Sequence, residues 1–222
     1  MLIREIGVLI RKEFDLEIRN KVAIGGILLY VVTTVFLCYL SFRELQDTTV
    51  WNTLFWVILL FSALNTISKS FQTESRYRLL YLYTLVSPAA VILSKMIYNI
   101  LLMGITALVT LLFYSLFLGT SPLEGANAGM YLVALILGCA GFAGIFTMIA
   151  AIAAKTGNQL GIMAILGFPL ILPLLLTLIG LSGIALRGLP WEYGTTELLI
   201  LTGLNILIAA LSYILFPYLW RE

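Results

Sequence analysis

Long apolar segments recur along nearly the whole chain and limit what it can fold into. Six of them lie at residues 22–40, 51–67, 89–118, 130–154, 160–181 and 198–219. A helix needs about 20 apolar residues to cross a bilayer. Backbone polar groups in lipid must be paired within the protein, and the period-two alternation of a barrel strand is absent here. The sequence therefore predicts six transmembrane helices.

The composition agrees with a polytopic membrane protein. Of the 222 residues, 61% are hydrophobic and 11% are charged, whereas a soluble domain is about a quarter charged. Six spans leave no room for a soluble catalytic domain, so we expect an all-α fold with a single transmembrane domain at 1–222. Its expected parts are an interfacial helix at 1–21, the first two spans within 22–67, a cytoplasmic segment at 68–88 and the remaining spans within 89–222.

The N-terminal segment, residues 1–21, is charged throughout and amphipathic. Its apolar positions recur in steps of three or four residues, at Ile3, Ile6, Ile10, Phe14 and Ile18. Basic and acidic residues interleave with them, which is typical of a helix that lies in the membrane interface. Two interpretations remain open: a plain juxtamembrane anchor, or an elbow helix that helps to seat a cytoplasmic partner.

The placement of Lys and Arg predicts the orientation in the membrane. If the spans alternate from a cytoplasmic N-terminus, every Lys and Arg except Arg43 and Arg187 falls on the cytoplasmic side. Cytoplasmic loops carry such an excess of basic residues. We therefore expect both termini and residues 68–88 to lie in the cytoplasm.

The charged interruption at residues 68–88 is the candidate coupling site. Charges crowd its first half, an aromatic and aliphatic stretch follows, and Ser87-Pro88 ends it. A short helix of this kind suits docking of a soluble ATPase. The expected contact residues are Lys69, Phe71, Glu74, Arg76, Tyr77, Arg78 and Leu82. The alternative is a basic loop that only sets the topology.

Residue types needed for most catalytic chemistry are missing. The chain has no histidine, which excludes HExxH zinc sites, Ser-His-Asp triads and His-ligated haem. It has no GxxxxGK[ST] phosphate-binding loop and no carboxylate at membrane depth of the kind that proton-coupled transporters use. Cys38 and Cys139 lie in apolar segments without metal-binding spacing, as small hydrophobic residues do. We expect a non-enzymatic chain that binds no metal or cofactor and takes its energy from a partner.

Two of the spans contain residues that shape helices. The fourth has Gly138, Gly141 and Gly144, which allow close contact between helices. Packing within the chain and a homodimer seam both remain open for these glycines. The fifth has Pro169 and Pro173, which each remove a helix hydrogen bond, so this helix is expected to bend or break. Such a kink suits a moving transporter and a static bundle equally.

Polar residues at membrane depth are uncharged. Hydrogen bonds between helices through such groups contribute roughly 0.6–2 kcal/mol each. We expect a mainly structural role for Thr33, Thr34, Ser62, Asn65, Asn99, Thr106, Thr147 and Asn205.

Several of these features occur in an order that resembles the haem exporter protein B family (CcmB), the membrane subunit of the cytochrome c maturation ABC transporter. The resemblance is carried by Ser87-Pro88 followed by Lys95, the small-residue run 138–144, the stretch KTGNQLG at 155–161 and the stretch FPLILPLL at 168–175. It covers essentially the whole chain. Family members often have a glycine and an acidic residue in the middle of the charged loop, where this chain has Arg76-Tyr77-Arg78.

The resemblance implies a subunit like an ABC-2-type permease, in a bacterial inner membrane. Its implied partners are a cytoplasmic ABC ATPase that holds the ATP, other cytochrome c maturation membrane subunits and a haem chaperone, with a homodimer allowed inside the complex. The implied function is to couple ATP hydrolysis to haem delivery or to release of the haem-loaded chaperone. The alternative is an ABC-2-type permease that exports a lipid, a polysaccharide or a drug.

Overall fold

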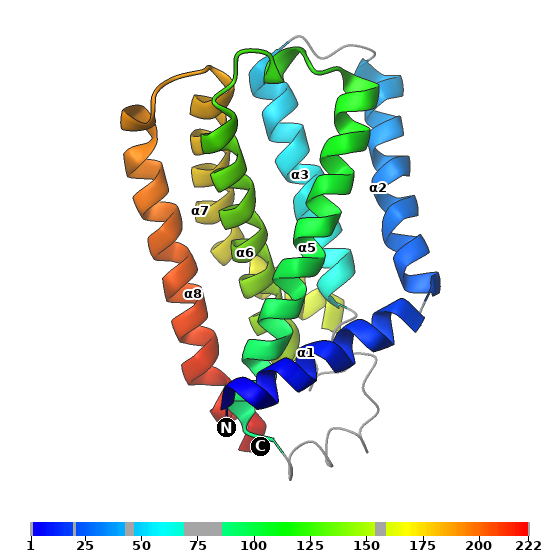
Figure 1. Cartoon of the computed structure of the whole chain (residues 1–222), viewed down its shortest axis with the longest axis vertical. Coiled ribbons are helices and arrows are strands. Elements are labelled where there is room, and N and C mark those ends of the chain that lie inside the picture. Colours follow the sequence, from blue (N-terminus) through cyan, green and yellow to red (C-terminus); the bar gives the residue numbers. More distant parts are fainter. Residues whose placement is uncertain (1, 20, 43–46, 69–85, 154–158, 222) are drawn as a thin grey trace.

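In the computed structural model, the described part of the chain consists of helices and the turns that connect them (Figure 1). The structure describes residues 2–19, 21–42, 47–68, 86–153 and 159–221. The long helices are α1 (Leu2–Arg19), α2 (Lys21–Phe42), α3 (Thr48–Ile67), α5 (Pro88–Leu118), α6 (Ala128–Ala153), α7 (Gln159–Leu186) and α8 (Thr195–Arg221). Short 3₁₀ helices follow α5 and α7, namely η2 (Ser121–Leu123) and η3 (Trp191–Gly194).

Six helices among the described residues are long and apolar enough to cross a membrane. They are α2, α3, α5, α6, α7 and α8, and Figure 1 shows them standing together as one bundle. The prediction of an all-α polytopic membrane protein with six spans is confirmed.

Helix α1 is amphipathic and lies across one end of the bundle, against the lower part of α5 in Figure 1. Its Leu9 is buried and Ile6 packs against the same core, whereas Val8 is 65% exposed. The described end of α8 reaches this same end of the bundle (Figure 1). We call it the α1 end, and the other end the opposite end.

Helix α6 is the centre of the bundle. It packs against α3, α5, α7 and α8, and 72% of its span is buried, compared with 11% for α2 and 17% for α8. Its neighbours contribute large aromatic side chains, of which Trp51, Phe55, Trp56 and Tyr114 are fully buried. The small residues of α6 let these large side chains approach the helix axis.

Connections at the opposite end are tied together by backbone hydrogen bonds. Asn127 N–H donates to the carbonyl of Ala185 at 2.8 Å, and the Asn127 side chain accepts from Met130 N–H at 3.2 Å, so this residue caps α6. Gly188 has φ +68, and a side chain there would meet the Gly125 carbonyl oxygen at 2.5 Å. Only glycine fits this close approach without strain.

Helix α7 extends further toward the opposite end than its apolar pattern predicts. The sequence indicates an end near residue 181, but the helix continues to Leu186. Ser182 does not stop the helix because its hydroxyl donates to the carbonyl of Leu178 at 2.5 Å, within the same helix.

Candidate functional site

All seven residues expected to contact an ATPase lie outside the described residues, namely Lys69, Phe71, Glu74, Arg76, Tyr77, Arg78 and Leu82. The flanks of their segment are described. Ser68 closes α3, where its backbone N–H donates to the carbonyl of Leu64, and Val86 and Ser87 lead into α5. The candidate coupling site can therefore be described through these flanking residues and the residues that they contact.

Ser87 is the N-cap residue of α5, and Pro88 takes the first helical position, where its missing N–H costs no hydrogen bond. The Ser87 side chain does not cap its own helix. Its hydroxyl instead donates to Glu5 Oε2 on α1 at 3.1 Å, and its backbone N–H lies 3.5 Å from the same oxygen. A carboxylate at the start of a helix is also favoured by the helix dipole.

Lys95 lies two turns into α5, and its side chain is only 2% exposed. Its ammonium donates to Glu13 Oε1 on α1 at 3.3 Å, and the Glu13 side chain is 13% exposed. Replacing a buried ion pair with apolar groups is often nearly neutral, while removing one partner costs several kcal/mol. The pair therefore fixes where α1 sits on α5 more than it adds net stability.

An aromatic contact completes this interface. Phe14 of α1 packs edge-on against Tyr98 of α5, with ring centroids 5.2 Å apart. We call the three pairs Glu5–Ser87, Glu13–Lys95 and Phe14–Tyr98 the α1–α5 seam. In the first two pairs the partners are separated by the same 82 residues along the chain. The eight-residue step from Glu5 to Glu13 therefore matches the step from Ser87 to Lys95.

The seam joins α1 to α5 through a hydrogen bond, an ion pair and an aromatic contact. Among the described residues, no three His, Cys, Asp or Glu side chains gather where they could hold a metal ion. Sequence reasoning noticed Ser87 and Lys95 but missed their partners Glu5 and Glu13. The available signal was the equal spacing of two acids on an amphipathic segment and of a serine and a lysine at the start of a span.

Each glycine expected to pack helices faces a different neighbour of α6. A Cβ on Gly138 would lie 2.5 Å from the Trp56 ring of α3, and one on Gly141 would lie 2.7 Å from Leu174 of α7. A Cβ on Gly144 would lie 2.9 Å from Ile208 of α8. All three glycines are thus covered within one copy of the chain.

Pro169 and Pro173 lie inside α7, which continues through both of them as one helix. Both side chains are exposed on the outside of the bundle. The helix does not break there, and Thr177 donates its hydroxyl to the carbonyl of Pro173 at 2.7 Å.

Buried polar contacts connect the spans. Trp56 Nε1 donates to Ser182 Oγ at 2.8 Å, and that hydroxyl lies 2.9 Å from Asn52 Oδ1, so that α3 is tied to α7. Asn99 donates to Thr147 Oγ1 at 2.8 Å between α5 and α6. Sequence reasoning singled out Asn99 and Thr147 but missed Asn52 and Ser182, which lie at the edges of their apolar segments.

The chain was compared with models of known protein families. The family model described as CcmB protein matches residues 4–218, which is essentially the whole chain. No curated protein sequence matches the chain.

Proposed function

Since the chain belongs to the CcmB protein family, and so is a membrane component of the haem exporter ABC transporter, we propose that it couples ATP hydrolysis on a partner chain to haem transfer. The coupled event is haem delivery or release of a haem-loaded chaperone. The ATPase is a separate cytoplasmic subunit that binds residues 69–85. This chain is the permease subunit and carries no catalytic role of its own.

The observation that carries the proposal is the α1–α5 seam. Its Glu5–Ser87 contact lies directly after residues 69–85, and its Glu13–Lys95 contact lies two turns further along α5. A displacement of the preceding segment would therefore act on α1 and α5 together. Helix α5 also packs against α2, α3, α6 and α8, so its motion would reach most of the bundle.

The proposed setting is a bacterial inner membrane with both termini in the cytoplasm. The seam then lies on the ATPase side, together with the basic residues of α1. Support comes from the distribution of Lys and Arg, since Arg187 lies at the opposite end and α1 carries Arg4, Arg11 and Lys12. The other proposed partners are further cytochrome c maturation membrane subunits and the haem chaperone.

A charge-reversal experiment tests the coupling segment. Arg76→Glu with Arg78→Glu should reduce the amount of ATPase that copurifies with the tagged chain in mild detergent. The same variant should lower haem staining of c-type cytochromes in a strain whose own copy is deleted. Arg187→Glu is the matched control, because Arg187 is exposed at the opposite end, and both readouts should stay at the wild-type level.

Two outcomes would contradict the proposal in different ways. Undiminished ATPase recovery with the Arg76 and Arg78 variant would rule out this segment as the docking site. Normal cytochrome c maturation in the deletion strain would rule out the haem pathway and favour export of another substrate.

A further inference from the structure

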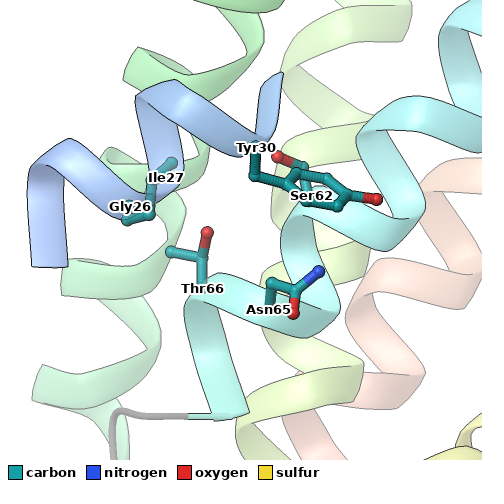
Figure 2. Close-up of a pocket in the computed structure, with 6 residues that line it drawn as sticks. All are labelled: Gly26, Ile27, Tyr30, Ser62, Asn65 and Thr66. Atoms are coloured by element: carbon teal, nitrogen blue, oxygen red, sulfur yellow. The ribbon is translucent and has the colours of Figure 1, made fainter. Parts of the chain in front are cut away.

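A cavity of about 200 Å³ opens between α2 and α3 near the α1 end (Figure 2). Gly26, Ile27 and Tyr30 line it from α2, and Ser62, Asn65 and Thr66 line it from α3. Figure 2 shows the Thr66 hydroxyl pointing from α3 toward α2. None of the described residues that line it is charged.

Two hydroxyl groups in this cavity have no hydrogen-bond partner among the described residues. They are Ser62 Oγ and Thr66 Oγ1, on side chains that belong to residues only 1% and 5% exposed. Elsewhere in the spans such hydroxyls donate to the carbonyl four residues earlier, as Thr106 does to Leu102 at 2.9 Å. A buried hydroxyl left unpaired costs about 1–3 kcal/mol, so a pair of them indicates an external acceptor.

On the α2 wall of the cavity, Gly26 leaves space beside Ile27 and Tyr30. A Cβ placed on Gly26 would meet no other atom within 4 Å, and the same holds for Gly25. The space in front of the two hydroxyls is therefore open, and a ligand group can enter it between the helices.

The depth of the cavity corresponds to the boundary between headgroups and acyl chains. Helix α2 begins at Lys21, so Gly26 lies about 8 Å along it, and Thr66 is one residue from the end of α3. Exposed apolar side chains adjoin the lining residues in sequence, with Leu29 70% exposed and Phe61 50% exposed. On a span these side chains face lipid, so an acyl chain can run along them.

We propose that the α2–α3 cavity binds the glycerol-ester region of a membrane phospholipid, with the hydroxyls of Ser62 and Thr66 donating to ester carbonyl oxygens. The described lining residues are uncharged, which suits a neutral acceptor better than a phosphate, since a phosphate would call for Lys or Arg. A carbonyl oxygen accepts the hydrogen bonds that the two hydroxyls cannot make within the protein. The acyl chains remain outside the cavity, against the exposed faces of α2 and α3.

Lipid retention by the full-length chain tests the proposed lipid site. The protein is extracted in mild detergent, together with any proteins that copurify, and bound lipid is measured by native mass spectrometry. The probes are a diester phosphatidylethanolamine and its diether analogue with the same headgroup and chains. The diether lacks the carbonyl oxygens, so we expect it to bind about tenfold more weakly, the effect of losing two neutral hydrogen bonds.

Substitutions on α2 and α3 test whether the lipid binds in this cavity. Ser62→Ala with Thr66→Val should lower diester binding to the level of the diether and leave diether binding unchanged. Gly26→Leu should fill the open space and reduce binding of both lipids. Thr53→Val is the matched control on α3, because the Thr53 hydroxyl already donates to the carbonyl of Thr49 at 2.8 Å. Melting temperature and gel filtration confirm that each variant is folded.

Equal retention of the diester and diether lipids by the wild-type chain would overturn carbonyl recognition without any variant being needed. Undiminished diester binding by folded Gly26→Leu would overturn the location.

Discussion

Lys95 shows how a single residue can set the geometry of an interface. A buried ammonium requires an opposite charge, because desolvation penalises it heavily. Glu13 supplies that charge at 3.3 Å from another helix. The two residues are 82 positions apart in the chain, so helical periodicity, which relates near neighbours, gives no sign that they meet.

Removal of the Glu13 charge should weaken the seam. We expect Glu13→Gln to lower the free energy of unfolding by about 3 kcal/mol, because it removes the charged carboxylate that the Lys95 ammonium contacts at 3.3 Å. Asp15→Asn is the control, since Asp15 is an exposed acid on the same helix and its loss should have little effect. Thermal unfolding in detergent measures both. Equal melting temperatures for the two variants would contradict a structural role for the ion pair.

Gly138 is the glycine whose replacement should lower the stability of the protein most. A Cβ there would lie 2.5 Å from the Trp56 ring, and Trp56 donates to Ser182 at 2.8 Å. Gly138→Ala should therefore displace the indole and destabilise the protein by about 1–3 kcal/mol. Gly104→Ala on α5 makes the same change where no atom lies within 4 Å, and should be tolerated. Identical melting temperatures for Gly138→Ala and Gly104→Ala would contradict a packing role for Gly138.

At the scale of elements, α7 contradicts one of the two outcomes expected from its prolines. Each proline removes a backbone donor, which predicts a bend or a break, and α7 does not break, since it is one helix from Gln159 to Leu186. Both proline rings are exposed, whereas Leu174 and Leu178 of the same helix are buried. The prolines thus lie on a face where their rings displace no packed neighbour, and a helix held by its other face can continue through them.

Restoring a backbone hydrogen-bond donor in α7 should stabilise the helix. Pro173→Ala returns the N–H that can bond the carbonyl of residue 169, so we expect a higher melting temperature, with at most about 3 kcal/mol gained. Leu172→Ala is the neighbouring control on an exposed position and should bring no gain. Haem staining of c-type cytochromes in the same strains then separates the two interpretations of the prolines. Lower maturation by a more stable Pro173→Ala chain would favour motion over a static bundle.

Element types could be predicted well from the sequence, and element partners could not. Apolar length predicts each span, and the steps from Ile3 to Ile18 predict α1, because both signals are local. Which helix a glycine faces depends on how its neighbours are rotated. Gly138, Gly141 and Gly144 consequently meet three different helices, which spacing alone does not indicate. The seam likewise depends on how α1 and α5 are placed together, which the equal spacing of its residues does not fix by itself.

At the scale of the whole molecule, α6 holds the bundle together and α2 lies at its margin. Helix α6 is the most buried span described and α2 the least. The cavity of Ser62 and Thr66 lies beside α2, in the loosely covered part of the bundle. Its hydroxyls could be noticed in the sequence as polar residues at depth, but the absence of a partner for them is a property of the packed structure.

Orientation of the bundle gives the last prediction. The α1 end should face the cytoplasm, so Asp15 and Glu124 should lie on opposite sides of the membrane; both are exposed. After Cys38 and Cys139 are replaced by Ala, single substitutions Asp15→Cys and Glu124→Cys can be probed with a membrane-impermeant maleimide on intact spheroplasts.

We expect labelling of the Glu124→Cys chain at once and of the Asp15→Cys chain only after the membrane is permeabilised. Arg187→Cys should behave like Glu124→Cys, because both positions lie in connections at the opposite end. The reverse pattern would invert the topology and place the α1–α5 seam away from any cytoplasmic ATPase. Different labelling of Glu124→Cys and Arg187→Cys would contradict the span count itself, since an even number of crossings separates the two positions.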